Sequence, residues 1–272
     1  MAHKPILYIV KLGGGIIDQP EALEACLSSF ATLARQQPGT PPVHTLLVHG
    51  GGKLATELAS QLGITQELRE GRRITDLETL KVVTMVYAGF INKSIVASLQ
   101  ANGCNALGIS GADGNLITAQ KRAASPIDYG YVGDPIVVNT ALLDALFTQT
   151  ITPVIAPITH NKLGQLLNTN ADTIAQTLAV ALSKHYNVEL IYTFEQNGVL
   201  ADTNNPDSVI GIINKATYRT LKEKNIIHSG MLPKLDNAFA ALEAGVATVR
   251  IGKAHALLSL AKGQTGTSIT HA

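Results

Sequence analysis

Short apolar runs alternate with longer amphipathic segments along most of the chain. The short runs are nearly continuous in apolar residues, which is typical of strands buried on both faces of a parallel sheet. The longer segments repeat apolar residues every three or four positions, as helices that cover such a sheet do. Strands are predicted over residues 6–10, 43–48, 106–109, 136–138, 153–158, 190–194 and 248–251, and helices over residues 21–35, 53–62, 76–101, 141–147, 171–184, 215–224 and 234–244. The alternation predicts an α/β fold around a mainly parallel sheet.

Glycine and capping residues between these segments predict where helices begin and end. The composition of residues 111–134 predicts a change of architecture in the middle of the chain. Gly63 and Gly245 follow the last apolar positions of two helices, where glycine commonly ends a helix, and Thr140 can cap the start of another. Residues 111–134 are rich in Gly, Asp, Asn and Tyr and predict loops or a small hairpin layer. A two-lobed organisation would divide the chain near residues 159–165, into lobes 1–164 and 165–272.

The composition fits a folded globular chain and argues against several functional classes. Of the 272 residues, 46% are hydrophobic and 15% are charged, so the chain is not of the disordered, highly charged kind. The formal net charge is +1, which argues against a broad nucleic-acid-binding surface. We therefore expect no nucleic-acid partner.

Cysteine usage and hydropathy predict a cytoplasmic location. Cys26 and Cys104 make no disulfide framework and lack metal-ligand spacing, which suits a reducing compartment. The apolar stretch at residues 5–10 is too short for a signal peptide. The long charge-free runs at residues 94–112 and 145–161 contain polar residues or prolines, so we expect no membrane span.

Glycine-rich loops follow two of the predicted strands. A third segment, which begins with one glycine, leads into a predicted helix. They are Lys11-Leu12-Gly13-Gly14-Gly15, His49-Gly50-Gly51-Gly52-Lys53 and Gly230-Met231-Leu232-Pro233-Lys234. Glycines after a strand let the backbone N–H groups approach a ligand, and a helix start favours phosphate or carboxylate. One such loop would be no more than a tight turn, but two glycine triplets directly after apolar strands favour an anion site at the carboxyl edge of the sheet.

Two lysines of these loops strengthen the prediction of an anion site. Lys53 and Lys234 stand at predicted helix starts, where a cation is unfavourable by about 0.3–1 kcal/mol. Pro233 supports the second helix start, because proline is common in the first turn. A bound anion would offset the unfavourable position. For Lys53 a solvated side chain on a frayed first turn is an equally good interpretation.

Known sequence motifs exclude several other classes of site. No Walker A motif is present, because Leu54 follows Gly52-Lys53, and no G-x-G-x-x-G follows a strand. Gly108-Ile109-Ser110-Gly111 misses the nucleophile elbow of hydrolases by one residue. No H-E-x-x-H occurs and the eight histidines show no ligand spacing, so we predict no protein metal site.

Two further clusters contain polar residues in excess of what local structure needs. In Asn168-Thr169-Asn170-Ala171-Asp172 one Asn suffices to cap the following helix, and Asp172 suits its dipole. The surplus side chains could hold a ligand or orient lysine ammonium groups. Arg72 and Arg73 stand in a polar turn; they are either a solvated basic turn or a grip for a carboxylate, which arginine binds through two parallel hydrogen bonds.

Together these segments resemble the amino acid kinase family, in particular its members that act on N-acyl-L-glutamate. The resemblance covers nearly the whole chain, and the order and spacing of its motifs make it specific. The motifs are Lys11-Leu12-Gly13-Gly14, Val48-His49-Gly50-Gly51-Gly52, Gly71-Arg72-Arg73-Ile74-Thr75, Ala88-Gly89-Phe90-Ile91-Asn92-Lys93, Gly108-Ile109-Ser110-Gly111-Ala112-Asp113-Gly114, Tyr131-Val132-Gly133-Asp134, Asn168-Thr169-Asn170-Ala171-Asp172, Gly230-Met231-Leu232-Pro233-Lys234 and Gly266-Thr267-Ser268-Ile269.

The resemblance implies an open three-layer αβα sandwich, a homodimer, and phosphorylation of the side-chain carboxylate of an N-acyl-L-glutamate by ATP with Mg²⁺, in arginine synthesis. The N-terminal lobe would bind the acylglutamate and form the dimer, and the C-terminal lobe would bind ATP. By their place in the motifs, catalysis is expected of Lys11, Lys234 and Asp172, substrate binding of Gly51, Gly52, Arg73 and Asn168, and nucleotide binding of Gly13, Gly14, Glu195, Gly198 and Leu200.

The chain also departs from the family pattern. Glu195 stands where relatives usually carry Asp, which affects the expected nucleotide contacts, and Ala112 stands where many have Lys. Only a few residues precede the first predicted strand, so the extra N-terminal helix associated with hexameric, arginine-inhibited members is not expected.

The expected chemistry needs alignment and charge neutralisation rather than a strong general base. The nucleophile is an ionised carboxylate, so the protein has to align two anions and stabilise the charge on the transferred group. Kinases of carbamate, aspartate, glutamate or UMP remain alternatives, as does a non-catalytic nucleotide or amino-acid sensor. N-acetyl-L-glutamate is the expected substrate, and a larger acyl group such as succinyl remains open.

Overall fold

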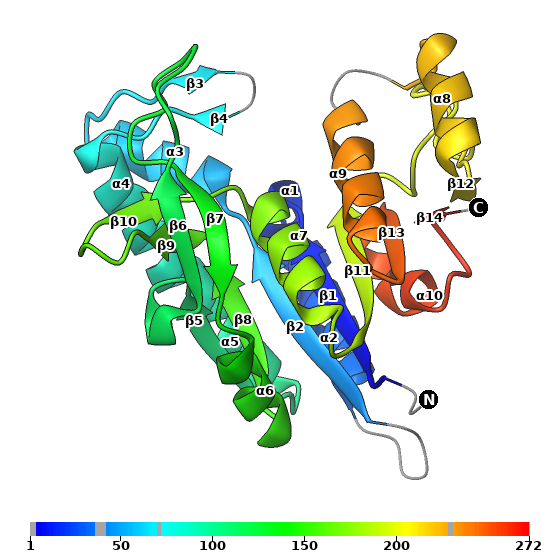
Figure 1. The fold of residues 1–272 in the computed structure, drawn as a ribbon, viewed down its shortest axis with the longest axis horizontal. Coiled ribbons are helices and arrows are strands. Elements are labelled where there is room, and N and C mark those ends of the chain that lie inside the picture. The colour runs from blue at the N-terminus through cyan, green and yellow to red at the C-terminus, as the bar shows by residue number, and fades with distance from the viewer. Residues whose placement is uncertain (1–3, 36–41, 70–71, 228–230, 272) are drawn as a thin grey trace.

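A computed structural model of the chain describes residues 4–35, 42–69, 72–227 and 231–271. Its centre is an eight-stranded sheet with the strand order β12-β14-β13-β11-β1-β2-β8-β5 (Figure 1). Neighbouring strands are parallel except for the β13–β14 pair. The strands are β1 (Ile6–Leu12), β2 (Val43–His49), β5 (Ala106–Ser110), β8 (Thr152–Ala156), β11 (Asn187–Phe194), β12 (Ile212–Ile213), β13 (Thr248–Lys253) and β14 (Thr267–Ile269). The predicted α/β fold around a mainly parallel sheet is confirmed.

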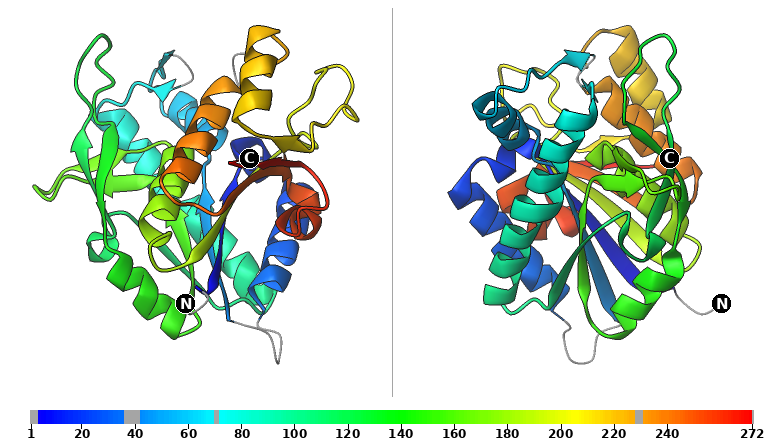
Figure 2. Two further views of the ribbon diagram at one scale, coloured as in Figure 1. Left: turned by 45° about the vertical axis from the view of Figure 1, so that its right-hand side comes forward. Right: turned by 90° about the vertical axis from the view of Figure 1, so that its left-hand side faces the viewer.

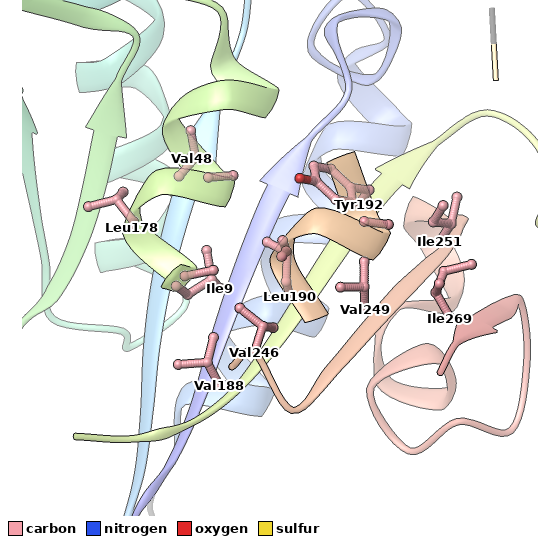
Figure 3. Close-up of a cluster of buried hydrophobic side chains, with 14 of the residues drawn as sticks. Ile9, Val48, Leu178, Val188, Leu190, Tyr192, Val246, Val249, Ile251 and Ile269 are labelled. Carbon is pink, nitrogen blue, oxygen red and sulfur yellow. The ribbon is translucent and has the colours of Figure 1, made fainter. Parts of the chain in front are cut away.

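Helices cover both faces of this sheet, which makes three layers. Successive residues of β1 point to opposite faces, so Leu7 and Ile9 belong to one apolar core, and Val10 and Leu12 to the other. The first core includes residues of α6, α7 and α9, and Figure 3 shows part of it around Leu190. The second includes residues of α2, α3, α4, α5 and α10. The helices are α1 (Gly14–Ile17), α2 (Pro20–Ala34), α3 (Gly52–Gln61), α4 (Leu77–Thr84), α5 (Asn92–Ala101), α6 (Thr140–Thr148), α7 (Ala171–Leu182), α8 (Lys215–Glu223), α9 (Leu232–Glu243) and α10 (Leu257–Ala261).

The predicted helix over residues 76–101 is one continuous helical segment with a change of pitch inside it. A π-helical stretch, Met85–Ile91, joins α4 to α5, and Figure 2 shows the teal segment running along one side of the sheet. Leu77–Ala101 is long and apolar enough to cross a membrane by length and composition. In the fold, its inner side instead contributes Leu80, Ile95 and Leu99 to the second core.

A smaller four-stranded sheet and a short hairpin lie beside the large sheet (Figure 1). The small sheet has the order β10-β9-β6-β7 and contains an antiparallel β6–β7 pair, so the hairpin layer predicted within residues 111–134 is confirmed. A two-stranded hairpin, β3–β4, leads into α4. These strands are β3 (Leu68–Arg69), β4 (Arg72–Arg73), β6 (Ile117–Lys121), β7 (Gly133–Val138), β9 (Ile158–His160) and β10 (Leu166–Asn168).

Two local predictions were wrong. The strand predicted over residues 153–158 is divided between β8 and β9, because Pro157 lies between them and has no N–H to donate to a ladder. Asn139, not Thr140, caps α6, since the Asn139 side chain accepts a hydrogen bond from the Leu142 N–H at 3.3 Å. The glycines predicted to end helices, Gly63 and Gly245, do follow α3 and α9, both with positive φ.

The division expected near residues 159–165 falls inside the β9–β10 hairpin, whose strands pair with each other. The large sheet also contains strands from both sides of residue 164, with β1 hydrogen-bonded directly to β11. The strands of the two expected lobes therefore share one sheet.

Candidate active site

The parallel sheet brings the two glycine-rich loops that follow β1 and β2 to the same edge. Lys11 of β1 pairs with Val48 of β2, and Leu12 with His49, so both strands end side by side. A cavity of about 360 Å³ opens at this edge. Its lining comes from β1, the β2–α3 loop, both peripheral hairpins and the start of α7, and consists of Lys11, Gly14, Gly50, Gly51, Gly52, Leu68, Arg72, Arg73, Tyr87, Arg122, Val132, Pro157, Asn168, Thr169, Asn170, Ala171 and Asp172.

Gly51 is a position where the loop after β2 requires glycine. Its φ is +142°, and a Cβ atom there would lie 2.1 Å from Ile91 Cδ1. Gly14, in contrast, has no atom within 4 Å of an added Cβ, so its backbone faces open space at the cavity. The helices α1 and α3 begin at Gly14 and Gly52, which turns N–H groups toward the cavity edge.

Lys11 and Asp172 form an ion pair in the cavity. The Lys11 Nζ lies 2.7 Å from Asp172 Oδ1, and the two side chains are 11% and 22% exposed. Asn170 caps α7 by accepting from the N–H groups of Asp172 and Thr173 at 2.8 and 3.2 Å. Because Asn170 satisfies the helix start, the Asp172 carboxylate is available to Lys11.

Lys234 is the second expected catalytic lysine, in the first turn of α9. It is half-buried, and its Nζ lies 5.1 Å from the centre of the Phe194 ring. Burial lowers the pKa of Lys234; the Asp172 carboxylate raises it, and the Lys11 ammonium lowers it. Lys234 is therefore within electrostatic range of Lys11 and Asp172, although it does not itself line the cavity.

Arg73 is a buried cation tied to the glycine loop. It is 9% exposed and donates to the Gly52 carbonyl and to Thr56 Oγ1, both at 2.8 Å, and to Gln66 Oε1. Asn168, at the end of β10, also lines the cavity and donates to Thr75 Oγ1 at 3.1 Å. The expected substrate-binding residues Gly51, Gly52, Arg73 and Asn168 thus line a single cavity.

The sequence left two interpretations open for Lys53 and for Arg72, a solvated side chain or an anion-binding one. Lys53 is 67% exposed, with its Nζ 4.0 Å from Glu57 Oε1, and does not line the cavity, so the solvated interpretation is the right one. Arg72 is exposed, as a solvated turn predicts, but it also lines the cavity beside Arg73.

Four expected nucleotide contacts, Gly13, Glu195, Gly198 and Leu200, lie outside the cavity, and only Gly14 lines it. A Cβ at Gly13 would lie 2.7 Å from the Thr193 carbonyl oxygen. Gly198 is buried, and a Cβ there would lie 2.7 Å from Val209 Cγ1, so packing alone requires glycine at this position. Leu200 is buried and pairs with Val209. Glu195 is exposed, with its carboxylate beside Gly15 in the loop after β1. Gly71 and Gly230 of the family motifs lie outside the described residues.

A buried histidine supports the loop after β2. His49 is 0% exposed, and burial lowers its pKa to about 4, so its ring is neutral near pH 7. The Asn92 side-chain amide donates to the Val154 carbonyl at 3.0 Å and lies 3.1 Å from His49 Nε2. An amide NH₂ only donates, so Nε2 accepts and the proton sits on Nδ1, which donates to the Gly50 carbonyl at 2.9 Å.

Sequence reasoning missed several residues of the cavity, above all Arg122 and Tyr87, and gave Val132, which stands in one of the family motifs, no role. Arg122 follows β6 in a region predicted as loops or a hairpin, and nothing in its local pattern signals a binding residue. Its guanidinium pairs with Asp134 and lies 5.6 Å from the centre of the Tyr129 ring. Within the described ranges no group of three or more His, Cys, Asp or Glu gathers as metal ligands.

Comparison with known proteins identifies the class to which this site belongs. Residues 7–253 match the model of the amino acid kinase family, so the chain belongs to this family. The acetylglutamate kinase of Cytophaga hutchinsonii is 53% identical over 255 residues, which are 93% of this chain and 94% of that protein. The acetylglutamate kinase of Methanopyrus kandleri is 37% identical over 241 residues, 87% of this chain and 91% of that protein.

Solved structures share the same fold. The N-acetylglutamate synthase from Neisseria gonorrhoeae, complexed with coenzyme A and N-acetyl-glutamate, matches with a TM-score of 0.80 at 22% identity, over 99% of this chain and 60% of that chain. The carbamate kinase of Giardia lamblia bound to AMP-PNP matches with a TM-score of 0.68 at 14% identity, over 100% of this chain and 99% of that chain. At these identities the likeness concerns the fold alone.

Proposed function

We propose that this chain is an ATP-dependent kinase of an N-acyl-L-glutamate, which it converts to the acyl phosphate in arginine biosynthesis. The observation that carries the proposal is one cavity with the Lys11–Asp172 ion pair, both glycine loops and the buried Arg73 around it. Relatives about 50% identical over more than 90% of the chain, named acetylglutamate kinases, support the reaction and the substrate class.

The geometry can perform the reaction without a general base. The side-chain carboxylate of the substrate is already ionised, and Arg73 would hold the α-carboxylate and so fix the orientation of the molecule. The N–H groups of Gly51, Gly52 and Gly14, with Lys11 and Lys234, would stabilise negative charge on the phosphoryl group as it moves. Asp172 lies with both lysines and reduces their mutual repulsion.

Mg²⁺ would enter with the nucleotide rather than occupy a protein cage. Mg²⁺ in kinases is bound largely by phosphate oxygens and water, with one or two carboxylates. The single carboxylate of the cavity lining, Asp172, is paired with Lys11, so phosphate oxygens and water would supply most ligands of the ion. The ion would neutralise phosphate charge, and Gly13 and Gly14 after β1 would contact the nucleotide. Glu195, Gly198 and Leu200 remain proposed nucleotide contacts on the strength of the family motifs.

A homodimer in the cytoplasm is proposed as the working form. Two buried free thiols, Cys26 and Cys104, suit a reducing compartment, and burial raises the pKa of Cys26 to about 12. The helical segment Leu77–Ala101 exposes Leu77 (50%), Met85 (54%) and Phe90 (67%), which gives an apolar surface for a second copy. Light scattering on the purified protein tests the state; a monomer at micromolar concentration would contradict it.

Two alternatives follow from other features of the site. A kinase of carbamate or another small carboxylate would use the same lysines but would not need Arg73. A non-catalytic sensor would bind the ligands without turnover, but a site that retains Lys11, Asp172 and Lys234 favours catalysis.

Incubation with ATP, Mg²⁺ and a panel of N-acylglutamates, followed by trapping of the acyl phosphate with hydroxylamine, tests the proposal. We expect hydroxamate to form with at least one N-acylglutamate and not with glutamate, aspartate or bicarbonate plus ammonia. Absence of hydroxamate from every N-acylglutamate would refute the kinase function.

A further inference from the structure

The cavity contains more positive charge than the proposed reaction with an N-acetyl substrate requires. Its lining includes four cationic side chains, Lys11, Arg72, Arg73 and Arg122, and one carboxylate, Asp172. Lys11 pairs with Asp172 and would face the reacting phosphoryl group, and Arg73 would take the α-carboxylate. Arg72, and the part of the Arg122 guanidinium that does not pair with Asp134, are then left without a substrate anion, because an acetyl group ends in an uncharged methyl.

Neither surplus arginine is fully engaged by the protein itself. The Arg72 side chain has no ion-pair or hydrogen-bond partner among the described residues. Arg122 pairs with Asp134 through Nε and Nη2, which leaves its Nη1 without a partner in the described part of the chain. The pairing to Asp134 and the contact with the Tyr129 ring hold the Arg122 guanidinium in place at the cavity.

Backbone hydrogen bonds place the two arginines on joined hairpins. Arg72 belongs to β4, and Thr75 just beyond it bonds with the segment before β7 through Tyr131 N–H at 2.7 Å. Arg122 follows β6, and its N–H bonds to the Val132 carbonyl at 2.8 Å. Figure 1 shows the β3–β4 hairpin close to the tip of the β6–β7 hairpin. Both hairpins therefore contribute to one side of the cavity.

Apolar side chains on the same hairpins complete this subsite. Leu68 of β3 and Val132 before β7 line the cavity beside the two arginines. A chain of methylene groups can pack on Leu68 and Val132, while a terminal carboxylate meets Arg72 and Arg122. This order of apolar and then cationic groups fits an extended acyl arm with an anionic end.

From this arrangement we infer that the acyl group of the substrate carries its own carboxylate, as a dicarboxylic acyl group such as succinyl does, and that Arg72 and Arg122 bind it. The inference rests on the proposed function and narrows its substrate class. Arg72 and Arg122 thus select the acyl arm, and Arg73 binds the part common to all N-acylglutamates.

The sharpest test compares N-succinyl- with N-butyryl-L-glutamate, since the two acyl chains have the same number of carbons and differ in the terminal carboxylate. A charge-assisted contact to arginine should raise kcat/KM for the succinyl compound roughly 10–100-fold over the butyryl compound. In Arg72→Leu this ratio should fall toward unity, and Arg72→Lys should retain part of it.

Matched variants separate the outcomes. Arg69→Leu removes an exposed arginine of the same hairpin, which pairs with Glu67 and lies outside the cavity lining, so the succinyl-to-butyryl ratio should not change. Arg73→Ala should weaken both substrates alike. Equal use of both acyl compounds by the wild type, or equal losses on both in Arg72→Leu, would overturn the inference while leaving the kinase function intact. Failure of every N-acylglutamate would instead refute the proposed function.

Discussion

The surroundings of Lys234 suit its proposed role of meeting a phosphate group during turnover. Its burial lowers the pKa, which means that the ammonium is less stable there than in water, and the Lys11 charge adds to this cost. The Asp172 carboxylate raises the pKa and so offsets part of this cost. A phosphoryl group that gains negative charge would stabilise the same ammonium further, so the benefit grows toward the transition state.

Lys234→Ala should lower turnover roughly 10²–10³-fold, by analogy with the loss of one preorganised donor to a transition state. KM for either substrate should change much less, because the contact strengthens as charge develops. Steady-state kinetics with both substrates varied measures the two effects separately.

Lys81→Ala is the matched control for this variant, since Lys81 is 66% exposed and pairs with Glu78 on α4. Its kinetics should match those of the wild type. If Lys234→Ala instead raises only KM for ATP, Lys234 binds ground-state phosphate and has no special role in the transition state.

Arg73→Ala should raise KM for the acylglutamate and leave KM for ATP nearly unchanged. Truncating one partner of a partly desolvated arginine–carboxylate pair costs about 2–5 kcal/mol. Some fall in turnover is also expected, because binding of the remote carboxylate positions the reacting one. Arg73→Lys should be impaired too, since lysine has no planar fork.

Arg69→Ala is the control for Arg73, because the cavity-lining Arg72 cannot serve as one. The Arg69 side chain is 61% exposed and pairs with Glu67. An increase of acylglutamate KM in Arg69→Ala but not in Arg73→Ala would show that Arg73 is not the carboxylate-binding residue.

At the scale of elements, the loop between β2 and α3 depends on one glycine. Gly51→Ala places a Cβ against Ile91 in a backbone conformation that alanine rarely adopts, so it should destabilise the protein by about 1–3 kcal/mol. Urea unfolding measures this loss. Because Gly51 lines the cavity, turnover should fall as well.

Gly14→Ala provides the contrast, since open space surrounds this position and its φ lies outside the positive range. Its stability should match or slightly exceed that of the wild type. Any effect should appear as a raised KM for ATP, where the added methyl meets the nucleotide. Loss of stability in Gly14→Ala would mean that this loop is more tightly packed than the geometry indicates.

The sequence predicted those elements whose signals lie within a few neighbouring residues. The strands β1 and β2, the loops after them and the helices α2, α3, α7 and α9 are marked by apolar periodicity, glycines and caps within a few residues. The short strands β3, β4, β10, β12 and β14 were missed, because two or three residues are too few to display a period. For β12 the pairing partner, β14, also lies far along the chain.

The same limit applies to the site. Lys11 and Asp172 stand in a glycine-rich and an Asn-rich motif and Arg73 in a polar turn, and the match of these segments to the family motifs gave their expected roles. Arg122 could not be found in this way, because its place in the cavity depends on the pairing of β6 with β7 and on the bonds that join this hairpin to Thr75. A residue such as Arg122, which follows a strand with a weak sequence pattern, is brought to the site by tertiary structure and leaves no local signal in the sequence.

For the whole molecule, the buried His49 predicts a loss of stability in acid. Its pKa is about 4 in the folded state against 6.5 as the ordinary value, so between these pH values the unfolded chain binds the extra proton. The free energy of unfolding should therefore fall as pH decreases from 6.5 to 4, by about 3 kcal/mol in total from this residue.

Urea unfolding of the wild type and His49→Gln at several pH values between 7 and 4 measures this contribution. The glutamine variant can keep both hydrogen bonds but cannot titrate, so its stability should depend less steeply on pH. His44, whose pKa burial also lowers, is present in both proteins and cancels in the comparison. Parallel pH profiles of the two proteins would rule out His49 as the source.

The position of β1 in the sheet has a consequence for the protein during its synthesis. β1 pairs with β2 on one side and with β11, Asn187–Phe194, on the other. A ribosome delivers β1 and β2 early, but the second edge of β1 has no partner until most of the chain has been translated. An unpaired edge of apolar residues is a template for association with other chains. The strand that carries Lys11, the proposed catalytic lysine, is therefore one that we expect chaperones to shield in nascent chains.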